Sequence, residues 1–137
     1  MKLNLKTIVV NATQAEFDFH ACPGMSVTIA YANKALLNSL KEQSMIQKFD
    51  TETGTPYKDL DVNVYLAKYI GAVVKGWKGF TGAHLASLVL INEDDIDLGA
   101  EIDFDAETAE FLMKESSVFD AWVVATAKTL ANFRPAK

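Results

Sequence analysis

Hydrophobic and polar residues alternate along the first third of the chain with the period of two that is typical of β-strands. Phe17 and Phe19 alternate with polar neighbours, and a Pro-Gly pair follows at 23–24. Proline fixes φ and glycine permits a positive φ, so this pair favours a tight turn. The pattern predicts an antiparallel hairpin of residues 15–20 with 25–31, packed on a core by its aromatic and β-branched face. Further strand-forming residues occupy 3–10.

Beyond residue 32 the apolar spacing becomes helical, and side chains that cap helix N-termini precede each apolar stripe. A helix is expected over 33–45, and a second one from Asp61 with an apolar stripe that runs to Trp77. Between them, 47–59 is polar and contains Thr-Gly-Thr-Pro, which predicts a loop. Three more helices are expected, starting at Thr81, at Asp105 and at Ser116 or Ser117, and the last runs to Phe133 before Pro135 stops it.

The length and composition of the chain, together with these elements, indicate its fold class. A chain of 137 residues that is 50% hydrophobic suits one domain with a real core. We therefore predict a single α+β domain over 1–137, with a strand-rich part at 1–31 and a helical part at 32–137. An antiparallel N-terminal sheet would pack with about four helices. The sequence has one cysteine and neither a signal peptide nor an apolar run of membrane-spanning length, so we expect a cytoplasmic protein.

The charge is uneven along the chain. Residues 1–78 carry 9 lysines against 7 acidic residues, a net +2, whereas 79–137 carry 4 basic against 11 acidic residues, a net −7. Nucleic-acid binding needs clustered positive charge, which neither half offers. The Lys-Gly-Trp-Lys-Gly-Phe segment at 75–80 mixes basic and aromatic residues, but Trp77 is expected to anchor the core.

Catalytic candidates are few. His20 and Cys22 alternate on one strand face, but Cys-His catalysis also needs an orienting group and oxyanion donors, and no residue pattern marks them. Together with the distant His84 they lack the paired spacing of a zinc site. We expect no catalytic residue, metal or cofactor.

An acidic run extends from Glu93 to Glu107. A calcium loop beginning at Glu93 would have leucine at its sixth position and phenylalanine at its twelfth, where glycine and glutamate are required. A solvated acidic loop is expected, with the electrostatic docking of a basic partner segment as the functional alternative.

The order of several short segments along the chain is more distinctive than any of these candidate sites. The segment at 73–80 precedes the acidic stretch, and Ile-Asp-Phe-Asp-Ala-Glu-Thr at 102–108, Phe-Leu-Met at 111–113, a phenylalanine at 119 and Ala-Asn-Phe at 131–133 follow. This order resembles the tail assembly chaperones of long-tailed phages, in which a Gly-Trp-x-Gly segment, an Ile/Val-x-Phe-Ser/Asp-x-Glu helix start and an Asn-Phe ending recur. The resemblance covers 17–40 and 61–133. The insertion at 47–59 and the long link between Phe80 and Ile102 depart from it.

The resemblance implies a non-catalytic protein of the host bacterial cytoplasm. It would bind the tape measure protein and the tail tube protein during tail morphogenesis and form homo-oligomers. The acidic loop and the final helix are the expected contact region. A structural tail component, such as a tail terminator or tube accessory protein, is the alternative, and a small enzyme using His20 and Cys22 is a second rival. The expected contact residues are Asp94, Asp95, Asp97, Trp122 and Phe133.

Overall fold

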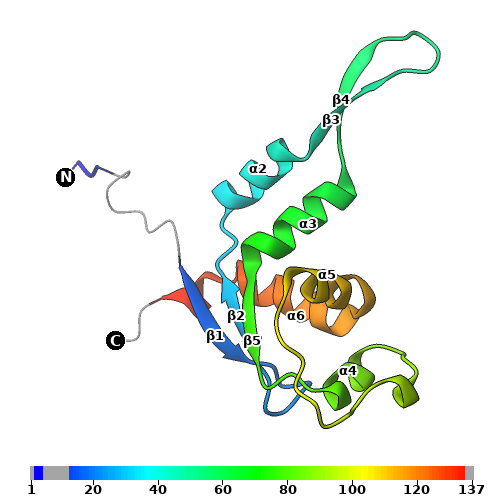
Figure 1. The fold of residues 1–137 in the computed structure, drawn as a ribbon. Helices are drawn as coiled ribbons and strands as arrows, with labels where there is room; N and C mark the ends of the chain where they lie inside the picture. Colours follow the sequence, from blue (N-terminus) through cyan, green and yellow to red (C-terminus); the bar gives the residue numbers. More distant parts are fainter. Residues whose placement is uncertain (1, 5–12, 135–137) are drawn as a thin grey trace.

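The computed structural model describes residues 2–4 and 13–134, and its elements are arranged as an α+β fold (Figure 1). An N-terminal antiparallel sheet packs with helices, as predicted. The strand expected over 3–10 falls, apart from its first two residues, outside the described residues, and so does Pro135.

A three-stranded antiparallel sheet with the order β1-β2-β5 forms one layer. Strand β1 (Gln14–Asp18) pairs with β2 (Ser26–Ala30), with Phe17 opposite Val27, which confirms the predicted hairpin. Its turn contains Gly24 at φ +91° and is closed by a 3.0 Å hydrogen bond that the Phe19 amide donates to the Met25 carbonyl.

The third strand replaces part of the expected second helix. Helix α3 (Val62–Val73) ends four residues before Trp77, and β5 (Val74–Lys78) then pairs with β2. The helical stripe predicted through Trp77 is therefore wrong beyond Val73. Gly76 has a poor helix propensity, and the free edge of β2 offers backbone partners to an extended chain.

The predicted helix starts are confirmed. Asn33, Asp61, Thr81, Asp105 and Ser116 each accept a backbone hydrogen bond as N-cap, so Ser116 rather than Ser117 starts the last helix. The remaining helices are α2 (Lys34–Gln43), α4 (Gly82–Leu88), α5 (Ala106–Glu115) and α6 (Ser117–Lys128). A short 3-10 turn, Glu93–Asp95, lies in the acidic loop. The last helix ends at Lys128 and a separate 3-10 turn, Leu130–Phe133, follows, so the helix predicted to run to Phe133 is wrong beyond Lys128.

The core lies between one face of the sheet and helices α3, α5 and α6. Val27 and Ile29 of β2 are fully buried, and they meet Val73, Leu112 and Phe119 in one hydrophobic cluster. Burying side chains of this size contributes about 1.5–3 kcal/mol each, so this cluster is the main source of stability.

Residues 45–60 form a hairpin where a polar loop was expected. Strand β3 (Met45–Phe49) pairs with β4 (Pro56–Leu60), and the hairpin extends beyond α2 and α3, away from the sheet (Figure 1). The turn forms because Asp50 Oδ1 accepts hydrogen bonds from the amides of Glu52 and Thr53, and Gly54 supplies φ +70°. Pro56 lies in a two-stranded ribbon, where every strand is an edge strand and proline is tolerated.

Candidate partner-binding groove

An apolar groove opens between α2, α3 and α6. Its volume is about 260 Å³, which is below the range of about 300–1,000 Å³ that is usual for small-molecule sites. The size suits one or two side chains of a docked segment better than a cofactor. The lining residues are Ala32, Leu37, Tyr65, Leu66, Tyr69, Asp120, Val124 and Lys128.

Two elements give the groove its walls. Tyr65 and Tyr69 lie one turn apart on α3, with ring centroids 6.2 Å apart. On α6, Asp120, Val124 and Lys128 follow at four-residue spacing, so they share one face of that helix. The groove floor is therefore aromatic and aliphatic, with one acidic and one basic side chain along the α6 wall.

The titration of Tyr69, on the α3 wall of the groove, is clearly displaced. Burial, with smaller contributions from the Tyr65 phenol and the Asp120 carboxylate, raises the pKa of Tyr69 to about 12. Its phenol is therefore neutral at physiological pH, and its hydroxyl can donate a hydrogen bond to a bound chain.

A second hollow, of about 190 Å³, lies between α3, β5 and α5. Small residues such as Ala67, Gly71 and Ala106 form much of its wall, with Lys75 and Glu110 beside them. It offers less aromatic surface than the groove, so we regard the groove as the stronger candidate.

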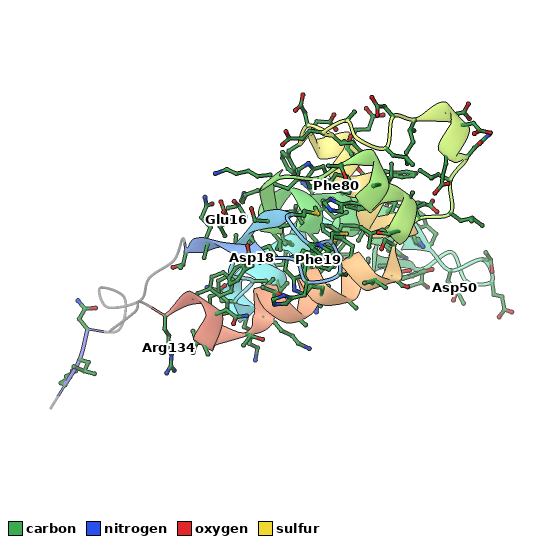
Figure 2. All side chains as sticks on the ribbon, turned by 90° about the horizontal axis from the view of Figure 1, so that it is seen from below. Glu16, Asp18, Phe19, Asp50, Phe80 and Arg134 are labelled. Atoms are coloured by element: carbon green, nitrogen blue, oxygen red, sulfur yellow. The ribbon has the colours of Figure 1, made fainter. Side chains whose placement is uncertain are left out.

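The five expected contact residues do not converge. Asp94, Asp95 and Asp97 are exposed on the acidic loop, which lies far from the C-terminal end of the described chain at Arg134 in both views (Figures 1 and 2). Trp122 is half-buried. Phe133 is 9% exposed and packs against Phe17 and Tyr31, with ring centroids 5.5 Å and 5.2 Å away. Phe133 belongs to the core, so it is not available as surface.

The acidic loop is solvated, as expected, and its backbone is tied to the rest of the domain. Its carboxylates from Glu93 to Glu107 are exposed. The amides of Gly82 and Ala83 donate to the carbonyls of Ala100 and Leu98 at 3.0 Å and 2.9 Å. Among residues 2–4 and 13–134, no three His, Cys, Asp or Glu side chains are grouped so that they could hold a metal ion.

His20 and Cys22 occupy different environments. The His20 side chain is exposed, whereas Cys22 is fully buried with its Sγ 3.9 Å from Ser87 Oγ. Burial raises the pKa of the Cys22 thiol, although the contact with Ser87 opposes this. A neutral, enclosed thiol is a poor nucleophile.

His84 has a structural role that the sequence did not reveal. Its Nδ1 accepts a 3.2 Å hydrogen bond from the Thr81 amide, so its Nε2 carries the proton and donates to the Pro23 carbonyl at 3.0 Å. The side chain therefore ties the β1–β2 turn to the start of α4. The Thr81–His84 spacing, three residues apart at a helix start, was the available signal.

Trp77 anchors the core, as expected. It is 8% exposed, and its indole Nε1 donates a 2.9 Å hydrogen bond to the Ile102 carbonyl. Its ring packs against Phe104 in a T-shaped arrangement, with centroids 4.9 Å apart. The basic and aromatic segment at 75–80 is therefore part of the packing between β5 and the loop before α5.

Comparisons of this chain with models of protein families, with curated proteins and with solved structures found no match. In the part of the chain that the structure describes, no helix has the length and apolar character needed to cross a membrane.

Proposed function

We propose that this chain is a tail assembly chaperone of a long-tailed phage, which binds an amphipathic helix of the tape measure protein in the groove between α2, α3 and α6. The observation that carries the proposal is the apolar groove itself. It is too small for a typical cofactor and is lined on three sides by helices. The order of sequence segments that resembles tail assembly chaperones gives the partner.

The groove suits a helix that presents apolar side chains at one-turn spacing. Helix-in-groove binding reads such side chains as anchors. Asp120 and Lys128 lie eight residues apart on α6, one at each end of its groove-facing row. They favour a partner helix with a basic residue toward one end and an acidic residue toward the other, because charge complementarity fixes register and orientation.

Binding without catalysis is part of the proposal. The burial of Cys22, in contrast to the exposed side chain of His20, supports it. The net charge of −5 would keep a chaperone–partner complex in solution. Recruitment of the tail tube protein, and action within the host cytoplasm, follow from the same resemblance.

Co-expression with the tape measure protein tests the proposal. We expect the two chains to co-purify, and we expect Val124→Asp to weaken the complex at least about tenfold, because it places a charge in an apolar groove. Val118→Asp is the matched control, since Val118 is also on α6, is 54% exposed and lies outside the groove lining. Correctly folded protein that fails to capture the tape measure protein would refute the proposal.

The alternative, a structural tail component, predicts a different location. Mass spectrometry of purified particles separates the two, because a chaperone is absent from the finished virion and a terminator or tube accessory protein is present.

A further inference from the structure

The two strands of the β3–β4 hairpin are more exposed than the other strands of the described chain. Nine of its ten strand residues are exposed, and Phe49 and Tyr57 expose 61% and 48% of their surface. It forms a two-stranded sheet of its own, apart from β1-β2-β5 (Figure 1). An isolated two-stranded hairpin is only marginally stable, and further strands make it stable. Pairing with a strand of a partner would therefore stabilise the hairpin.

Two hydrogen bonds at the ends of the hairpin fix its bonding pattern. The Asp61 amide donates to the Ser44 carbonyl at 2.8 Å, and the Asp50 amide donates to the Thr55 carbonyl at 2.9 Å. In an antiparallel pair, hydrogen-bonded and non-hydrogen-bonded residue pairs alternate. With the observed register, the bonded pairs between these two ends are Ile46–Asp59 and Lys48–Tyr57.

The two outer edges of the hairpin differ. On β3, the backbone groups of Met45, Gln47 and Phe49 point away from β4 and offer three amides and three carbonyls. On β4, the outward positions include Pro56, which has no amide hydrogen to donate. A proline at an outward position blocks pairing at a sheet edge. The edge of β3 is open and the edge of β4 is closed.

We propose that the occupant of the β3 edge is a second copy of this chain, paired antiparallel through β3 about a two-fold axis at Gln47. In this register Gln47 faces its own counterpart, and Met45 faces Phe49 of the second copy. All the outward amides and carbonyls of β3 are then satisfied, in about six backbone hydrogen bonds. The sulfur of Met45 also meets an aromatic ring, which is a favourable contact.

The charges at the proposed interface and the strand order of the combined sheet are both compatible with a dimer. Lys48 faces Ile46 of the second copy, and its Nζ is already 3.1 Å from Asp59 Oδ2, so no like charges lie directly opposite each other. The outer strands of the resulting sheet, β4-β3-β3-β4, are the two blocked edges. The assembly therefore closes at a dimer instead of growing into a filament.

The contact is small. Pairing of two five-residue strands buries well under the roughly 800 Å² per partner of a standard interface, so we expect a dissociation constant in about the micromolar range or weaker. The β3 edge is separate from the residues that line the groove, so this dimer and the proposed helix binding can fail or succeed independently.

Sedimentation equilibrium of the full chain from about 1 µM to about 1 mM tests the dimer. The mean mass should rise from 15.0 kDa toward twice that value. Gln47→Pro removes one outward amide per copy and should weaken dimerisation at least about tenfold. Lys58→Pro makes the same change at an outward position of β4 and should leave dimerisation unchanged. A chain that stays monomeric, or a dimer that Gln47→Pro leaves intact, overturns the proposal.

Disulfide formation gives a second readout that does not depend on proline. In the proposed register the two Gln47 Cα atoms are about 5.5 Å apart, within the range that a disulfide bridges. Gln47→Cys should therefore form covalent dimers in an oxidising glutathione buffer, while Lys58→Cys, three strand spacings from its counterpart, should not. Native Cys22 is fully buried and does not compete. Equal cross-linking of both variants would overturn the two-fold pairing.

Discussion

Phe19 stacks on Trp122, with ring centroids 4.5 Å apart and an interplanar angle of 28°. Phe19 follows β1 and is 3% exposed, whereas Trp122 lies on α6 and is half-buried. Phe119 completes the cluster in a T-shaped contact with Phe19, with ring centroids 5.6 Å apart. These three rings join the sheet to the last helix, so Trp122 supports the fold at a position where the sequence indicated a contact surface.

A double-mutant cycle should detect this stacking. We expect Trp122→Leu to destabilise the domain by about 1–3 kcal/mol, because the side chain is partly buried. The coupling between Phe19→Leu and Trp122→Leu should be about 0.5–1.5 kcal/mol in urea unfolding. Phe111→Leu, at a ring that is 43% exposed on α5, is the control and should change little. Strictly additive effects would show that the two rings do not interact.

Local chemistry made the helix starts and the first hairpin predictable. A side chain such as Asp105 caps a helix through its own neighbours, and the turn at 23–24 needs only its own Pro-Gly pair. The acidic loop was also predicted correctly to be solvated, because its own run of charged residues indicates exposure to solvent.

Strand β5 was not predicted because a β-bulge gives its buried residues a spacing that is typical of a helix. Val74 and Trp77 are both buried, although residues three apart normally point to opposite faces of a strand. The register with β2 shifts at this point, since Thr28 is opposite Gly76 and Ile29 opposite Val74, which leaves Lys75 as an extra residue. The resulting three-residue spacing of apolar side chains looks helical in sequence.

The groove could not be predicted because it depends on the relative placement of three helices. Leu37, Tyr65 and Val124 come from α2, α3 and α6, and their own neighbours do not indicate that they share a wall. The β3–β4 hairpin was missed for another reason. Its strands are exposed on both faces, so it lacks the apolar alternation that marks a half-buried strand.

Gly79 should be the least replaceable glycine of the domain. It adopts φ +70°, and a Cβ atom there would overlap the backbone carbonyl oxygen of Gly24. Gly54 has the same φ but open space around it, so Gly54→Ala should cost only about 1–2 kcal/mol of unfolding free energy. Gly79→Ala should cost at least about 1 kcal/mol more, because backbone must also shift. Equal melting temperatures for the two variants would contradict the close approach.

Acid should weaken the start of α5. The pKa of the Asp105 carboxyl is lowered because its oxygen accepts hydrogen bonds from the Thr108 amide and hydroxyl. A lowered folded-state pKa means that the unfolded chain takes up the proton first, so the stabilisation is present above the unfolded pKa and is lost as the pH falls through the folded pKa.

Asp105→Asn isolates this effect. Asparagine also caps helices but does not titrate, so the variant should be nearly as stable as the parent at pH 7 and should lose less stability below about pH 4. Asp105→Ala should be less stable at both values. Urea unfolding at pH 7 and in acid measures the difference, and parallel curves for the parent and Asp105→Asn would rule out a contribution from this carboxyl.

Alkali should destabilise the domain through Tyr69. Because burial raises its pKa to about 12, the phenol of the folded protein keeps its proton at a pH where the unfolded chain, with a pKa of about 10, has lost it. The unfolded state binds fewer protons in this window, so the free energy of unfolding falls as the pH rises from about 10 toward about 12. The full loss is on the order of 2 kcal/mol.

Tyr69→Phe removes the titrating hydroxyl and keeps the ring, so its unfolding free energy should fall less steeply above about pH 10 than that of the parent. Tyr57→Phe is the matched control, because the Tyr57 ring is 48% exposed on β4 and lies outside the groove. Chemical unfolding at intervals from about pH 8 to about pH 11 gives the slopes. If the slopes of Tyr69→Phe and Tyr57→Phe are the same, Tyr69 is solvated in solution, and the groove wall that its ring forms between α3 and α6 is not closed as the structure has it.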